Sequence, residues 1–149
     1  REAHRFEDLA QLLYAERGLV HLLKRLPGKK ILFTNAPQAY AKDVIKHLKL
    51  QGQFEQHISI ESMRVHGKSQ PKPSKSYLRK LLAKHGWQPR RCILVEDSAI
   101  NLRAAKEVGI RTVLVTAHSA HYPQKRLTNS IDITVKSVFE LARHYGLKK

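Results

Sequence analysis

The fold is decided by residues 92–98, which read Cys92-Ile93-Leu94-Val95-Glu96-Asp97-Ser98. An apolar run with strand character ends here in two carboxylates and a hydroxyl. Two further segments also carry polar side chains: Thr34 and Asn35 follow the apolar run Ile31-Leu32-Phe33, and Lys72 lies between Pro71 and Pro73. Parallel α/β sheets build their ligand crevices outside the carboxyl ends of the strands. The three segments therefore predict a ligand site that draws residues from distant parts of the chain.

Strand-like and helix-like segments alternate along the sequence. Strands are predicted at 31–33, 57–60, 92–95, 112–115 and 131–135. Helices are predicted at 39–48, 74–85, 100–108 and 138–145, with residues 6–26 helical and broken near Gly18. Polar loops are predicted at 62–74 and 117–130. This alternation indicates βα units and a mostly parallel sheet, so we expect an α/β, Rossmann-like three-layer sandwich.

Composition indicates a globular protein without disulfide bonds. The chain has 149 residues, of which 42% are hydrophobic, enough for one domain with a sizeable core. No apolar run approaches the roughly 20 residues of a membrane span, and no secretory leader is visible. The single cysteine, Cys92, lies within an apolar run. We expect a cytoplasmic protein that does not bind membranes.

The charge balance is strongly basic, with 28 Lys and Arg residues against 12 Asp and Glu residues. The formal net charge of +16 attracts anions, and nucleic acid is one partner that such a charge fits. The basic residues are, however, scattered over helix-like segments, which is typical of solvated faces. The sequence also lacks the interleaved aromatic residues of single-strand binders. Charge alone therefore favours solvated faces over nucleic acid binding.

Three motifs in sequence order resemble the haloacid dehalogenase (HAD) superfamily of phosphohydrolases. They are Phe33-Thr34-Asn35-Ala36, Pro71-Lys72-Pro73 and Glu96-Asp97-Ser98-x-x-Asn101-Leu102-x-x-Ala105-Lys106. The resemblance covers residues 26–116, and the first and third motifs are most similar to the pyrimidine 5′-nucleotidase branch. The resemblance implies a HAD-type sandwich that hydrolyses phosphate esters.

The resemblance implies that Thr34, Asn35 and Lys72 bind phosphate. The hydroxyl of Thr34 and the backbone amide of Asn35 would bind the phosphate oxygens, and Lys72 would stabilise the transferring group. Thr34 and Lys72 would thus be catalytic. Taken alone, Thr34 is better explained as a strand residue that caps the following helix. Lys68 and Lys75 are close rivals of Lys72, which the Lys-Pro pattern favours.

The resemblance also implies a magnesium site at Glu96 and Asp97. Mg²⁺ prefers oxygen ligands and usually takes one or two protein carboxylates. Asp97 would be the direct ligand, and Glu96 would bind directly or through water. In the alternative reading, Asp97 or Ser98 caps the helix that follows, and both readings can hold together. Ser98 and Asn101 are supporting residues, with Asn101 orienting the loop.

Other candidates carry weaker signals. His118 and His121 lie three residues apart in a predicted loop, without further ligands at zinc-site spacing. Cys92 lies within a predicted strand and reads as packed core rather than as a nucleophile. The remaining histidines form no coherent pattern.

The sequence departs from the HAD pattern at one point. The family carries an Asp-x-Asp at the end of its first strand, where the first Asp attacks phosphorus and the second transfers protons. No Asp-x-Asp occurs in this sequence. Because the first residue is Arg1, we expect a missing N-terminal segment that supplies the central nucleophile strand. Residues 1–26 would be the C-terminal part of a helical cap, and residues 27–149 the core domain without its first strand.

Two functions follow as expectations. The first is a Mg²⁺-dependent phosphomonoester hydrolase that acts through an aspartyl-phosphate on a small phosphorylated substrate such as a nucleoside 5′-monophosphate. In this case the residues of this chain alone would be inactive. The alternative is a non-catalytic HAD-like module that binds polyanions such as nucleic acid through its basic surface.

Overall fold

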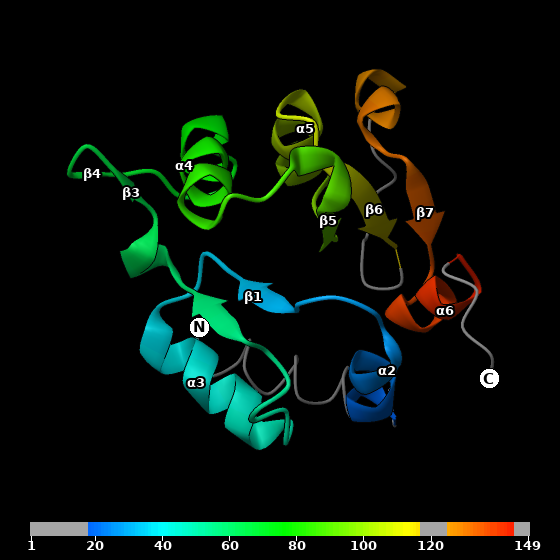
Figure 1. The fold of residues 1–149 in the computed structure, drawn as a ribbon. Coiled ribbons are helices and arrows are strands. Elements are labelled where there is room, and N and C mark those ends of the chain that lie inside the picture. Colours follow the sequence, from blue (N-terminus) through cyan, green and yellow to red (C-terminus); the bar gives the residue numbers. More distant parts are fainter. Residues whose placement is uncertain (1–17, 117–124, 145–149) are drawn as a thin grey trace. The chain divides into compact units, whose positions relative to one another are not determined.

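The computed structural model describes residues 18–116 and 125–144, and the chain divides into two compact units. The first unit comprises residues 1–62 and 142–149, and the second comprises residues 63–141. Figure 1 labels their elements. The predicted boundary at residue 26 stays a prediction, because the larger part of the proposed cap lies outside the described residues.

The first unit contains a βαβ arrangement. Strand β1 (Ile31–Phe33) pairs in parallel with β2 (Gln56–Ile58), and helix α3 (Gln38–His47) connects them. Ala41 and Ile45 of α3 are buried, as the helical spacing of apolar residues predicts. The backbone N–H of Gln38 donates to both carboxylate oxygens of Glu61, at 3.1 and 3.0 Å. A carboxylate at this position satisfies an N–H that the first helical turn leaves unpaired.

Two further short helices belong to the first unit. Helix α2 (Leu19–Arg25) follows Gly18, which has a φ of 91°. The described helix thus begins at the position of the predicted break, and the part of the predicted helix before Gly18 lies outside the described residues. The 3₁₀ helix η1 (Ile60–Ser62) begins two residues after β2, so the strand predicted at 57–60 ends earlier than expected.

The second unit contains a parallel three-stranded sheet in the order β5–β6–β7 (Figure 1). The strands are β5 (Ile93–Glu96), β6 (Arg111–Val115) and β7 (Ile133–Val135). Helix α5 (Ala99–Glu107) connects β5 to β6 and buries Leu102 and Ala105 completely. Val113, Leu114 and Val135 are buried on the strands, because a parallel sheet is covered by its crossover connections.

Helix α4 (Lys75–His85) precedes this sheet and has clear end signals. Ser74 caps its first turn, its Oγ accepting a hydrogen bond from the backbone N–H of Tyr77 at 3.1 Å. Gly86 ends the helix in the left-handed conformation with a φ of 66°. The 3₁₀ helix η2 (Pro89–Arg91) then leads into β5.

The segment before α4 differs from the prediction. Residues 62–74 were expected to form a loop, but β3 (Arg64–Val65) and β4 (Lys68–Ser69) make a short antiparallel hairpin. His66 and Gly67 form its turn with φ values of 52° and 76°. Strands of two residues bury too little to leave an alternating pattern in the sequence, so the pattern could not show them.

The C-terminal part also differs in detail. The 3₁₀ helix η3 (Lys125–Ser130) occupies the end of the segment predicted as a loop at 117–130. The helix predicted at 138–145 is a 3₁₀ turn, η4 (Val138–Glu140), followed by the short α6 (Leu141–His144). Predicted helices at 39–48, 74–85 and 100–108 are confirmed within one residue at each end. The α/β Rossmann-like fold class is likewise confirmed.

Among the described residues, no helix combines the length and the hydropathy that a bilayer crossing requires.

Candidate active site

Glu96 and Asp97 lie at the carboxyl end of β5, where the strand turns into α5. Glu96 is the last residue of β5 and pairs in register with Leu114 of β6. Ser98 caps α5, and its Oγ accepts a hydrogen bond from the backbone N–H of Asn101 at 3.5 Å. The sheet therefore fixes Glu96, and the helix cap fixes the turn that follows it. Ser98 thus holds the structural role that the alternative reading gave it.

Lys72 reaches Glu96 from the loop between β4 and α4. Its Nζ lies 2.9 Å from Oε2 of Glu96, although the residues are 24 positions apart. The side chains of Lys72 and Glu96 are 10% and 11% exposed. A charge-assisted bond this close in a largely buried place holds both groups in defined positions.

The structure separates Lys72 from its two rivals. Lys75 pairs instead with Glu107 of α5, at 2.9 Å, and both side chains are largely exposed. Lys68 lies exposed on β4 without an ion pair to any carboxylate of the described residues. Lys72 alone of the three reaches the end of β5.

The carboxyl group of Glu96 is under opposing influences. Burial raises its pKa above the ordinary value of 4.5, and the nearby charge of Asp97 acts in the same direction. The Lys72 ammonium and a hydrogen bond from the side chain of Asn101 lower the pKa but do not cancel the effect of burial. Asn101 thus contacts Glu96, as expected of a residue that orients the loop.

Asp97 is exposed, and it forms no hydrogen bond or ion pair with another described residue. Its carboxylate is open to an outside ligand, whereas that of Glu96 is already paired with a cation. One open carboxylate beside a second, paired one fits Mg²⁺, which commonly keeps several waters and adds substrate oxygens. Among the described residues, no group of three or more His, Cys, Asp and Glu side chains forms a closed metal site.

Thr34 and Asn35 belong to the first unit. Thr34 follows β1, and its backbone N–H donates to the carbonyl of Ile58 at 2.9 Å. Its Oγ1 accepts a hydrogen bond from the backbone N–H of Ala36 at 3.0 Å, which closes the turn toward α3. The capping role is therefore present, and the hydroxyl proton of Thr34 is not used by that bond. Among the predicted site residues, Lys72 and Asn101 contact Glu96, and Asn101 also contacts Ser98.

Cys92 has the surroundings of a structural residue. Its Sγ donates to the carbonyl of Gln88 at 3.4 Å, and burial raises the pKa of the thiol. A raised pKa reduces the thiolate fraction, so the cysteine is a poor nucleophile. His118 and His121 lie outside the described residues.

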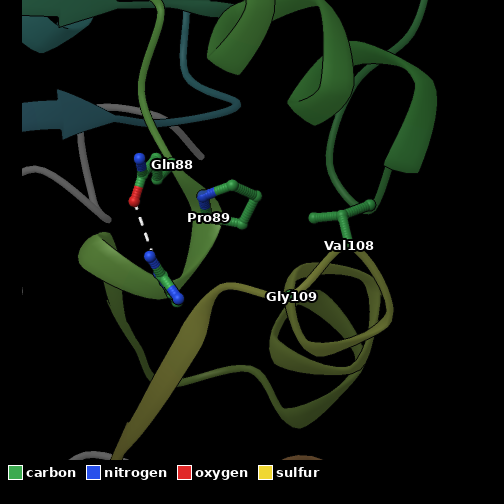
Figure 2. A pocket seen from close by; sticks show the side chains of 5 residues that line it. Gln88, Pro89, Val108 and Gly109 are labelled. Atoms are coloured by element: carbon green, nitrogen blue, oxygen red, sulfur yellow. Dashed lines mark hydrogen bonds between the residues drawn. The ribbon is translucent and has the colours of Figure 1, made fainter.

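An open cavity lies at the other end of β5 (Figure 2). It is lined by residues of the η2 segment and of the turn after α5: Gln88, Pro89, Arg90, Val108 and Gly109. Nε of Arg90 donates to Oε1 of Gln88 at 3.3 Å. Because η2 leads into the amino end of β5, this cavity is separate from the carboxylates at its carboxyl end.

Sequence reasoning missed the β3–β4 hairpin, which lies just before Lys72. Its one local signal is the pair His66-Gly67, since both residue types tolerate the left-handed conformation. Three residues of the hairpin, Arg64, His66 and Lys68, are basic and exposed. From the sequence, these residues were predicted to belong to the polar loop at 62–74.

Solved structures of HAD proteins share this fold. A conserved haloacid dehalogenase-like protein of unknown function from Agrobacterium tumefaciens is 22% identical, with a TM-score of 0.70 over 87% of this chain and 59% of its own. The L-2-haloacid dehalogenase of Xanthobacter autotrophicus, with chloropropionic acid covalently bound, is 16% identical, with a TM-score of 0.67 over 87% and 60%.

A third similar structure is that of the HAD protein YfnB from Bacillus subtilis, bound to magnesium. It is 14% identical, with a TM-score of 0.70 over 88% of this chain and 55% of its own. The chain thus spans less than two thirds of the length of each of these proteins.

The comparison with curated proteins gives no match. The sequence profile of the haloacid dehalogenase-like hydrolases matches residues 2–115, which is more than half of the chain. The order of the motifs, the parallel α/β fold and this match agree. The chain belongs to the haloacid dehalogenase-like hydrolase family.

Proposed function

We propose that the full-length protein containing this chain is a Mg²⁺-dependent phosphomonoesterase of the pyrimidine 5′-nucleotidase type, acting on nucleoside 5′-monophosphates. The observation that carries this proposal is the buried contact of Lys72 with Glu96, next to the open carboxylate of Asp97. Phosphoryl transfer depends mainly on fixed charges that neutralise the phosphate oxygens. The ammonium of Lys72 is one such charge, and the two carboxylates would hold Mg²⁺, which would supply the other.

Each residue has a distinct task in this proposal. Lys72, held in place by Glu96, neutralises charge on the transferring group. Asp97, with Glu96 directly or through water, holds Mg²⁺, which when bound supplies further positive charge to the phosphate oxygens. Asn101 keeps the carboxylate of Glu96 oriented. Phosphate binding by the hydroxyl of Thr34 and the backbone amide of Asn35 stays a prediction from their motif.

The attacking group comes from outside this sequence, which has no Asp-x-Asp. One feature of β5 supports a strand as its carrier. Among the described residues, β6 is the sole strand hydrogen-bonded to β5, and Ile93 and Val95 are each 38% exposed. Large apolar side chains on an open strand edge are expected to be covered in a parallel sheet. We propose that a strand ending in Asp-x-Asp pairs there and brings the nucleophile toward Glu96 and Asp97.

Dehalogenation is the second candidate, favoured by the names of similar structures such as the L-2-haloacid dehalogenase. These structures are less than 25% identical to this chain, so the similarity shows a shared fold but does not show a shared reaction. A halogenated acid has no phosphate group whose charge a lysine and a metal must balance. The pair of acidic side chains at the end of β5 therefore favours phosphate esters.

The test is the hydrolysis of an aryl phosphate by the full-length protein, with Mg²⁺ and with a chelator. We expect Mg²⁺-dependent activity that falls by about 100-fold in Asp97→Asn, the size of effect typical for the loss of one electrostatic group. Asp43→Asn on the exposed side of α3 is the matched control and should keep full activity.

Other outcomes separate the alternatives. Chloride release from 2-chloropropionate without phosphate release would identify a dehalogenase. Full activity in Asp97→Asn would exclude the metal role of Asp97. A protein with an intact Asp-x-Asp that shows neither activity would support the non-catalytic alternative.

A further inference from the structure

The β3–β4 hairpin and helix α4 form a face of the second unit with one sign of charge. Residues 62–95 contain nine Lys and Arg residues and no Asp or Glu. Lys72 belongs to the candidate active site, and Lys75 pairs with Glu107. The basic face, as we call it, consists of the exposed residues Arg64, Lys68, Arg79, Lys80 and Lys84.

Hydrogen bonds hold the two parts of the basic face together. The ammonium of Lys80 donates to the backbone carbonyl of Arg64 at 2.7 Å, which ties the hairpin to α4. The guanidinium of Arg64 donates to the carbonyl of Gly67 across the hairpin turn. Figure 1 shows the hairpin beside α4. The charges of the basic face therefore lie on a defined surface rather than on a free loop.

No residue of the basic face forms an ion pair with a carboxylate in the described part of the chain. Elsewhere in the same unit, Lys106 pairs with Asp132 and Arg103 pairs with Glu107. Other cations of this unit are exposed and form no ion pair with a described residue: Arg90, Arg91, Arg111 and Lys136. Like charges without counter-charges repel one another, and an anionic partner relieves this repulsion. Because five unpaired cations are gathered on the hairpin and α4, the charge of this face is available to a partner.

The exposed side of α4 has small side chains between its basic residues, so a partner molecule can come close to the helix. Between its basic residues it exposes only the small side chains Ser76 and Ala83, while Tyr77, Leu78 and Leu82 are buried on the other side. From Arg79 to Lys84 the helix rises about 7.5 Å. Measured along the duplex axis, the phosphates of one DNA strand follow one another about every 3.4 Å, so this rise corresponds to roughly two such intervals.

Two other classes of polyanion fit the basic face less well. An anionic membrane is bound by helices that also insert large apolar side chains, and the outer side of α4 has none. Protein interfaces are rich in aromatic residues and poor in lysine, which is the opposite of this composition. Interfaces with nucleic acid are strongly positive and take most of their affinity from phosphate contacts.

We propose that the basic face binds the sugar-phosphate backbone of nucleic acid without reading the base sequence. This inference is independent of the proposed phosphatase activity, because none of its five residues belongs to the candidate active site. The binding would keep the protein near nucleic acid.

The test measures binding of a short fluorescein-labelled DNA duplex and of a labelled RNA to the full-length protein by fluorescence anisotropy. The variant Lys68→Gln/Arg79→Gln/Lys84→Gln removes three charges and keeps the Lys80–Arg64 bond. The matched control Lys24→Gln/Lys42→Gln/Lys46→Gln removes three exposed charges from α2 and α3. Thermal unfolding of both variants shows whether they remain folded.

We expect the basic-face variant to bind at least about 10-fold more weakly and the control to stay within about twofold. The slope of log K against log salt, between about 50 and about 200 mM, should be shallower by up to about 2.7 in the basic-face variant and nearly unchanged in the control. Two labelled DNA duplexes of different base sequence should bind the wild-type protein with equal affinity.

Three results would overturn the proposal. One is the absence of saturable binding at about 50 mM salt, and another is an equal loss of affinity in both triple variants. The third is equal competition by polyglutamate or by phosphatidylserine vesicles at matched negative charge. The last result would identify an acidic protein or a membrane as the partner instead.

Discussion

The ammonium nitrogen of Lys72 lies 2.9 Å from a carboxylate oxygen of Glu96, and the two side chains are 10% and 11% exposed. The pair joins the loop before α4 to the end of β5. Removing two charges from water costs free energy that their attraction repays only in good geometry. Such a contact fixes the position of the charges at the end of β5, whether or not it adds to stability.

Removing Lys72 should destabilise the protein, because Glu96 would be left as a buried charge without a cation. We expect Lys72→Met to lower the free energy of unfolding by about 3–5 kcal/mol, as measured by urea denaturation. Lys68→Met, at an exposed position on β4, should change it by less than about 0.5 kcal/mol. The double variant Lys72→Met/Glu96→Gln should recover part of the loss. Equal midpoints for the two single variants would contradict this account of the pair.

The burial of Glu96 also predicts a pH dependence of stability. Burial raises the pKa of Glu96 above its ordinary value of 4.5, so the folded state holds this proton more strongly than the unfolded state. The resulting stabilisation is complete below pH 4.5 and is lost as the pH rises through the folded-state pKa. Urea midpoints of the wild type and Glu96→Gln should therefore diverge with rising pH, in favour of the variant. A difference between them that stays constant with pH would refute the prediction.

Asp132 should show the opposite dependence. The bond from Lys106 and the backbone N–H of Thr112 lower the pKa of this carboxyl below its ordinary value of 3.8. The folded state then releases the proton more readily, and the stabilisation present above pH 3.8 is lost as the pH falls through the folded-state pKa. The stability difference between the wild type and Asp132→Asn should shrink on acidification. If it grew instead, the bonds from Lys106 and Thr112 would not act on the carboxylate as described.

The sequence allowed much of the fold to be predicted, because helices and buried strands leave a regular apolar pattern. The α4 helix illustrates this, with its cap at Ser74, its buried Leu78 and Leu82, and its stop at Gly86. The β3–β4 hairpin could not be predicted in this way. It is held by the bond from Lys80 to Arg64, which is a tertiary contact that no local pattern records.

The candidate site shows the same division. The sequence placed Glu96 and Asp97 at the end of a strand, because the apolar run before them is distinctive. It favoured Lys72 over its neighbours only through a motif. The contact of Lys72 with Glu96 spans 24 positions and depends on the packing of the loop before α4 against the end of β5. An ion pair between residues so far apart in the sequence forms only when the chain folds, so the sequence pattern could not predict it.

Thr112 should be sensitive to the loss of its hydroxyl. This residue is fully buried in β6, and its Oγ1 donates to the carbonyl of Ser130 at 2.6 Å and accepts from the backbone N–H of Asp132 at 3.1 Å. Thr112→Val keeps the shape but removes the donor to the Ser130 carbonyl, while the N–H of Asp132 still donates to the carbonyl of Thr112 at 3.2 Å. We expect a loss of about 1–3 kcal/mol in the free energy of unfolding. Thr134→Val, at an exposed position of β7, should be nearly neutral, and equal losses at both positions would show that the buried bonds do not matter.

Gly109 and Gly86 form a matched pair for the cost of a side chain in left-handed backbone. Their φ values are 92° and 66°, and an added Cβ would meet Cβ of Pro89 at 3.2 Å at Gly109 but nothing within 4 Å at Gly86. Gly86→Ala should cost about 1–2 kcal/mol through its backbone alone. Gly109→Ala should cost more, because Pro89 must shift at the cavity in Figure 2. Thermal unfolding of the two variants measures the difference, and a smaller loss at Gly109 would mean that the turn before β6 yields easily to the added methyl group.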